Sequence, residues 1–123
     1  MKVLVTCTEG TIDAQVDPRF GRAAYFLIYD QSSADWQAYP NDGVNASGGA
    51  GVKAAQFSEN HKVEAVVSGH FGPNAFEALQ AADIKMFAFG DCQTAAESLQ
   101  RLANGQLKPV QAAARGGFNR RGS

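Results

Sequence analysis

Three glycines, Gly48, Gly49 and Gly51, cluster directly before a predicted helix. Such a turn lets a ligand approach the backbone closely, and the N–H groups at a helix start favour an anion. The pattern is typical of a nucleotide site, another anion site or a tight turn. A phosphate loop of the G-x-x-x-x-G-K-[ST] type is excluded, because Val52 and Lys53 follow Gly51. The dinucleotide pattern fits only loosely and follows a long loop, so we expect an anion other than a nucleotide.

Basic, imidazole and thiol side chains lie in other predicted loops. Arg19 and Arg22 would neutralise a polyanion or lie solvated in their loop. His70 would be a ligand, or a histidine that is hydrogen-bonded within its loop. Cys7 and Cys92 would contact a metal or pack as small buried hydrophobes, and no local C-x-x-C spacing decides between these roles.

The sequence contains no arrangement typical of an active site. Its motifs supply no Ser-His-Asp or Cys-His set for nucleophilic catalysis. A metal-dependent nuclease would need carboxylates in the first strand, and the run from Val3 to Cys7 has none. Glu9, Asp13 and Asp17 follow in the next loop, where we expect them to be solvated. We therefore predict that the protein is not an enzyme.

The bulk properties limit the class of protein. A chain of 123 residues suits one domain. Its net charge of -1 gives no reason to expect nucleic-acid or membrane binding. Only three apolar residues follow Met1 and Lys2 before Thr6, so we expect no signal peptide and a cytoplasmic location. The two cysteines should then be reduced.

Apolar runs and turn residues predict alternating strands and helices. The strands are expected at Val3–Val5, Tyr25–Tyr29, Asp35–Tyr39, Ala65–Val67 and Ile84–Phe89. The helices are expected from about Gly48 to Asn60, from Asn74 to Ala82, and from a capping box at Thr94 to a stop at Gly105. Hairpins make the first three strands antiparallel, and helical crossovers make the last two parallel. The expected fold is a three-layer, ribonuclease-H-like α/β domain, with a mixed five-stranded sheet of order 3-2-1-4-5 and only strand 2 antiparallel.

This topology places the loops with chemical groups at one rim of the sheet. Residues 8–22, 47–49, 68–73 and 90–92 all follow the carboxyl ends of strands that run in one direction. Open α/β sheets bind ligands at such a rim. Three helix starts would meet there, and each presents a positive dipole end to an anion.

Three sequence blocks occur together in the chain: Phe20-Gly21-Arg22-Ala23-x-Tyr25-Phe26, Ala46-Ser47-Gly48-Gly49-Ala50-Gly51 and Gly72-Pro73-Asn74-Ala75-Phe76-Glu77-Ala78-Leu79. With the length and the element order, they resemble the dinitrogenase iron–molybdenum cofactor biosynthesis family over residues 1–107. The resemblance implies a ribonuclease-H-like domain without nuclease activity. Residues 108–123 lie outside it, and their polar, basic composition predicts a mobile tail.

The resemblance also implies a carrier of an anionic metal–sulfur cluster. Within the family the chain is most similar to members that hold a molybdenum–copper sulfide cluster, and a related molybdenum or iron–sulfur cluster is the other candidate. A protein partner would take part in cluster delivery or regulation. The alternative is a metal-free protein-interaction or regulatory domain.

We expect the cluster to be held without covalent bonds to the protein. A cluster saturated with sulfide needs no thiolate, and two cysteines are too few for a four-cysteine iron–sulfur site. The residues expected to contact the cluster are Thr8, Arg19, Arg22, Ser47, Gly48, Gly49, Gly51, Gly69, His70, Phe71, Gly72, Asn74 and Gly90. Cys7 and Cys92 are the candidate metal ligands.

Overall fold

The computed structural model describes residues 1–43 and 48–113. The elements follow in the order β1 (Lys2–Cys7), β2 (Tyr25–Asp30), β3 (Trp36–Pro40), α1 (Ala50–Asn60), β4 (Ala65–Ser68), α2 (Pro73–Ala81), β5 (Lys85–Ala88), α3 (Ala95–Ala103) and β6 (Lys108–Pro109). The predicted strands and helices are all present, with ends that differ from the prediction by only a residue or two. No helix among the described residues has the length and apolarity that crossing a bilayer requires.

The strands form one mixed sheet of order β3-β2-β1-β4-β5-β6. β2 is antiparallel to both β1 and β3, whereas β4 is parallel to β1 and to β5. The ribonuclease-H-like order 3-2-1-4-5, with strand 2 antiparallel, is therefore confirmed.

The sheet has a sixth strand that the sequence did not predict. β6 pairs antiparallel with β5, and the next residue, Val110, donates its N–H to the Met86 carbonyl at 2.8 Å. Two residues that include a proline carry no periodic signal, which explains why β6 was missed. The segment expected to begin a mobile tail thus begins with a strand, and Val110 packs against the core.

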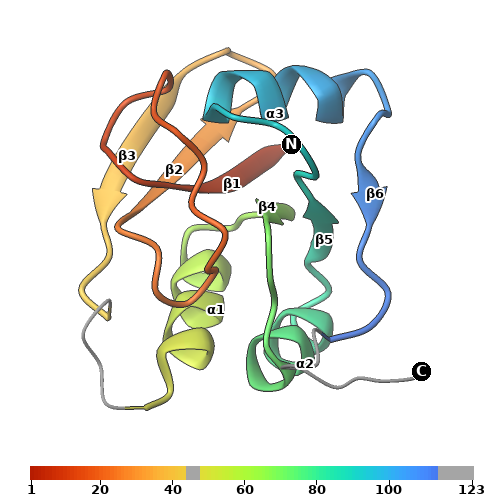
Figure 1. Cartoon of the computed structure of the whole chain (residues 1–123). Coiled ribbons are helices and arrows are strands. Elements are labelled where there is room, and N and C mark those ends of the chain that lie inside the picture. Colours follow the sequence, from red (N-terminus) through yellow and green to blue (C-terminus); the bar gives the residue numbers. More distant parts are fainter. Residues whose placement is uncertain (44–47, 114–123) are drawn as a thin grey trace.

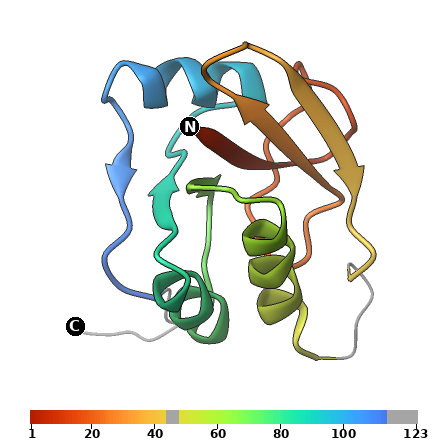
Figure 2. The same ribbon diagram turned by 180° about the vertical axis from the view of Figure 1, so that it is seen from behind.

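Helices cover both faces of the sheet, as Figures 1 and 2 show from opposite sides: α3 lies on one face, and α1 and α2 lie on the other. β1 is buried on both faces because its side chains alternate between the two layers. Leu4 belongs to the core beneath α1 and α2, and Val3 and Val5 belong to the core beneath α3. The sheet therefore separates two hydrophobic cores.

We predict that β6 stabilises the edge of the sheet. A chain ending at Leu107 should melt a few degrees below a chain ending at Ala113, because it loses β6 and the packing of Val110. Burial of one such side chain is worth about 1 kcal/mol. Thermal denaturation followed by circular dichroism would measure the difference. Equal melting temperatures would show that β6 contributes nothing to stability.

Candidate anion-binding site

The loops with chemical groups do meet at one rim. β1, β4 and β5 run parallel, and β3 runs in the same direction because it is antiparallel to β2. The segments after these strands therefore leave the same edge of the sheet. Figure 1 shows the loop after β1 and the segment between β4 and α2 at this edge of the sheet.

The loop after β1 is fastened to the segment that precedes α2. The His70 N–H donates to the Pro18 carbonyl at 2.7 Å, and the Phe20 N–H donates to the His70 carbonyl at 3.3 Å. The Phe20 ring packs on Phe71, with 5.4 Å between ring centroids. Arg19 therefore pairs with His70 as in a short parallel ladder. Phe71 is buried, so its side chain serves the core, whereas the His70 side chain is exposed.

Three rim glycines are packing positions. A Cβ atom added at Gly21 would lie 2.7 Å from the Gly51 nitrogen, and one added at Gly51 would lie 2.9 Å from the Ala75 Cβ. At Gly69 it would lie 2.8 Å from the Pro18 Cα. These contacts hold the loop after β1, the start of α1 and the start of α2 together. Of the predicted ligand contacts, Gly51 and Gly69 thus face protein atoms.

Other rim glycines are open. Among the described residues, a Cβ atom at Gly48, Gly49 or Gly72 would have no heavy atom within 4 Å. Gly49 adopts φ 72°, a left-handed conformation that favours glycine, and it directly precedes α1. Gly72 has φ -65° and directly precedes α2, next to the exposed Asn74. The backbone is therefore accessible at the starts of two helices that pack against each other.

These two helix starts differ from the third. At α3 the Thr94 hydroxyl accepts the Glu97 N–H at 3.1 Å, and the Glu97 carboxylate accepts the Gln93 N–H at 2.8 Å. Thr94 thus caps α3 as predicted, whereas the Glu97 carboxylate bonds the residue before the cap and not Thr94 itself, so the helix start is bonded within the protein. Among the described residues, no side chain caps α1 or α2, and neither helix has an acid in its first turn. Their starts therefore keep their affinity for an external anion.

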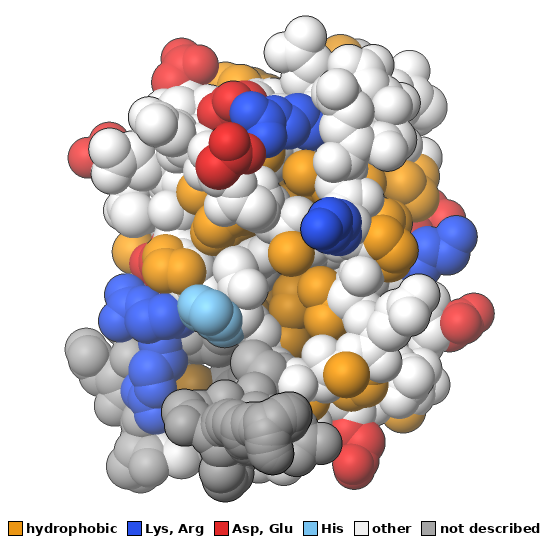
Figure 3. Space-filling model, turned by 45° about the vertical axis from the view of Figure 1, so that its right-hand side comes forward, with side chains coloured by type: hydrophobic (Ala, Val, Ile, Leu, Met, Phe, Trp, Pro, Cys, Tyr) orange, Lys and Arg blue, Asp and Glu red, His pale blue; other side chains and the backbone are white. Residues whose placement is uncertain are grey.

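The prediction that Asp17 is solvated is wrong, because the residue is buried and only 3% exposed. Its carboxylate accepts the Arg19 backbone N–H at 3.1 Å and the guanidinium Nε and Nη2 groups at 3.2 and 3.3 Å. The side-chain hydrogen bond to Asp17, with the carboxylate charge, raises the pKa of Arg19. Arg19 is therefore an oriented cation with a balanced charge. In Figure 3, Lys and Arg side chains gather beside a histidine, and most visible acids lie away from them.

Four predicted site residues lie on the α3 side. Cys7 and Cys92 are both buried in the core beneath α3. Burial raises the pKa of the Cys7 thiol to about 11, helped by the Asp17 charge, and burial raises the pKa of Cys92. Thr8 donates its hydroxyl to the Gln15 carbonyl at 3.3 Å, and Gly90 is open. Burial therefore favours the thiol form of both cysteines over the thiolate.

Two predicted positions remain, Arg22 and Ser47. Arg22 is half-buried and follows Gly21, which lies against the start of α1. Ser47 lies outside the described residues. Within residues 1–43 and 48–113, no three His, Cys, Asp or Glu side chains are grouped as a metal ion requires. The rim residues near α1 and α2 thus offer backbone N–H groups and cations, and these suit an anion better than a bare metal ion.

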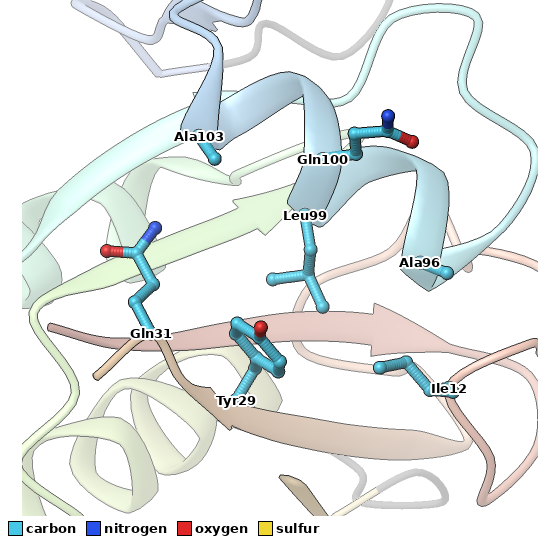
Figure 4. Close-up of a pocket in the computed structure, with 7 residues that line it drawn as sticks. All are labelled: Ile12, Tyr29, Gln31, Ala96, Leu99, Gln100 and Ala103. Carbon is cyan, nitrogen blue, oxygen red and sulfur yellow. The ribbon is translucent and has the colours of Figure 1, made fainter. Parts of the chain in front are cut away.

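A separate groove of about 470 Å³ lies between α3 and β2 (Figure 4). Its lining is Ile12, Tyr29, Gln31, Ala96, Leu99, Gln100 and Ala103. None of these side chains is charged. The groove is on the face opposite α1 and α2, so it does not contribute to the anion site.

The molecule is thus a three-layer α/β/α protein of ribonuclease-H-like topology, in which the first turns of two neighbouring helices, α1 and α2, contain no acid. The family model described as dinitrogenase iron-molybdenum cofactor matches residues 1–105, and the chain belongs to that family.

Solved structures agree. The orange protein from Desulfovibrio gigas, in its apo form, is 34% identical, with a TM-score of 0.88 over 93% of this chain and 96% of that chain. A putative NifB protein from Thermotoga is 31% identical, with a TM-score of 0.83 over 94% of this chain and 98% of that one. A comparison with curated proteins gave no match.

We predict opposite responses at two glycines. Gly51→Ala should destabilise the fold by about 1–3 kcal/mol, because its Cβ would press on Ala75 at 2.9 Å. Gly72→Ala should be close to neutral, because φ is -65° and the space is open. Urea denaturation of both variants measures this contrast. Equal stabilities would show that Gly51 is not a packing position.

The buried Cys7 thiol predicts a pH dependence of stability. Its pKa rises from 9.0 to about 11 on folding, so between these values the folded protein keeps a proton that the unfolded chain releases. The free energy of unfolding should therefore fall as pH rises through this range. In Cys7→Ala the free energy of unfolding, measured by urea denaturation, should fall less steeply as pH rises. Parallel profiles for the two proteins would contradict the assignment.

Proposed function

We propose that this protein is a non-enzymatic carrier of an anionic metal–sulfur cluster, held without covalent bonds at the starts of α1 and α2. The observation that carries the proposal is the pair of adjacent helix starts with no side-chain cap and no first-turn acid among the described residues. Unpaired N–H groups and the positive dipole end make such a start an anion site. Two of them side by side suit an anion larger than phosphate.

The family and its relatives support a metal–sulfur cluster as the anion. The family description names the iron-molybdenum cofactor of dinitrogenase, and both similar solved proteins cover nearly the whole chain. We favour a molybdenum–copper sulfide cluster, with a related molybdenum or iron–sulfur cluster as the other candidate. Sulfide ligands spread negative charge over many atoms, and copper prefers sulfur donors. The cluster thus brings its own ligands to the site.

The side chains near the site support capture without thiolates. Cys7 and Cys92 are buried beneath α3, on the other face of the sheet from α1 and α2. Gly48, Gly49 and Gly72, open among the described residues, permit close approach to the backbone, and we expect Arg19, Arg22, His70 and Asn74 to contact the cluster. A cluster held in this way passes to a protein partner in the cytoplasm without a change in the carrier's own bonds.

One observation favours a second function. The uncharged groove between α3 and β2 (Figure 4) would serve a metal-free protein-interaction domain, because its lining mixes apolar side chains with amide groups. The anion site plays no part in that function.

The proposal is tested by binding of tetrathiomolybdate, with and without Cu(I), followed by visible absorption and equilibrium dialysis. Gly72→Val should weaken binding about tenfold or more without loss of stability, because φ -65° accepts valine and its side chain fills the open approach. The Cys7→Ser, Cys92→Ser double variant should retain the cluster.

Thr8→Val is the matched control, since Thr8 is also exposed at the rim but is hydrogen-bonded to Gln15, which pairs with Thr94 at the start of α3. It should bind as the parent protein does. A parent protein that takes up neither tetrathiomolybdate nor its copper adduct would show that the proposed function is wrong. Loss of binding in Thr8→Val alone would show that the anion binds on the α3 side.

A further inference from the structure

The buried Asp17 carboxylate has no role in the capture mechanism described above. It is buried in the loop after β1, which is bonded to the segment that leads into α2, and its negative charge would oppose an anion bound there. We infer that Asp17 is a positioning residue, whose two oxygens hold the Arg19 guanidinium in a fixed direction for the bound anion. This inference rests on the proposed function.

Asp17 is itself held firmly by the ends of two central strands. Its N–H donates to the Thr6 carbonyl at 2.9 Å, and the Thr6 hydroxyl donates to the Asp17 carbonyl at 2.7 Å. The Thr6 hydroxyl is also hydrogen-bonded to the Ser68 hydroxyl at 2.8 Å. Thr6 and Ser68 are fully buried at the ends of β1 and β4. The carboxylate therefore stands on a rigid support, as positioning requires.

The geometry of the ion pair leaves part of Arg19 available. Both Asp17 oxygens are engaged, one by Nε and the other by Nη2. A guanidinium has five N–H donors, so other donors of Arg19 remain for a ligand. The Arg19 side chain is 62% exposed. The Arg19 backbone pairs with His70, two residues before Gly72, so the paired arginine belongs to a segment bonded to the one that leads into α2.

Two explanations of the pair predict opposite effects. If Asp17 only offsets the charge of Arg19, removing its negative charge should strengthen anion binding, because like charges repel. If Asp17 positions Arg19, the same change should weaken binding, because the released side chain must be ordered again when the anion binds. The sign of the change therefore separates positioning from simple charge balance.

The decisive variants are Asp17→Asn and Arg19→Lys. Asp17→Asn keeps the size and one acceptor oxygen but loses the charge-assisted fork, and we expect tetrathiomolybdate binding about tenfold weaker. Arg19→Lys keeps the positive charge but lacks the planar fork of two nitrogens that matches a carboxylate, and we expect a similar loss. Because Arg19→Lys leaves the buried carboxylate in place, it carries the test if Asp17→Asn does not fold. Arg19→Gln with Asp17→Asn should bind no more weakly than Arg19→Gln alone.

The matched control is Asp91→Asn. Asp91 also pairs with an arginine, Arg101, but it is exposed and lies by α3. This variant should leave tetrathiomolybdate binding unchanged. Unchanged or tighter binding in both Asp17→Asn and Arg19→Lys would overturn the inference, while the proposed function would stand.

A second measurement needs no ligand. The Arg19 Nε–H resonance in NMR spectra should exchange slowly with water in the parent protein and at least tenfold faster in Asp17→Asn, since a hydrogen-bonded N–H is protected. Equal exchange in the two proteins would overturn the positioning role. This result holds whether or not tetrathiomolybdate binds, so failure of the proposed function remains a separate outcome.

Discussion

Close contact between backbone segments at the rim determines the arrangement of the site. Gly21 lies against the Ala50–Gly51 backbone, and Gly51 lies against Ala75, at distances that leave no room for a Cβ atom. The loop after β1 and the starts of α1 and α2 can approach one another only because side chains are missing there. This approach places two helix dipoles side by side. The proposed anion site thus depends on close packing, and its open glycines are different residues from its packing glycines.

The same rim contains a buried ionic interaction. Moving a carboxylate out of water is costly unless it is paired and hydrogen-bonded, and the Asp17 carboxylate meets both conditions through the guanidinium and the backbone N–H of Arg19. The backbone of Asp17 is hydrogen-bonded to Thr6, whose hydroxyl also meets the Ser68 hydroxyl at the ends of β1 and β4. The network gives the loop after β1 one conformation, which a loop stabilised by apolar contacts alone would not ensure.

The sequence predicted the fold closely, because hairpin and crossover rules leave few topologies for this order of elements. The exception was β6, where two residues are too few for a period. The sequence also predicted which loops share the rim. It did not separate the packing glycines Gly51 and Gly69 from the open ones, since composition does not report what lies opposite a glycine. Nor did it predict the burial of Asp17, which depends on contacts with Thr6 and Arg19 after the chain has folded.

The proposed recognition by backbone N–H groups also bears on how such a protein can diverge. Apart from proline, as at Pro73, every residue at a helix start supplies an N–H group, so most substitutions that keep the helix keep the donors. What must be maintained is an absence: no bulk at Gly49 and Gly72, and no acid in the first turns of α1 and α2. A site defined in this way tolerates extensive sequence drift around it, and motif searches based on ligand side chains would not detect it.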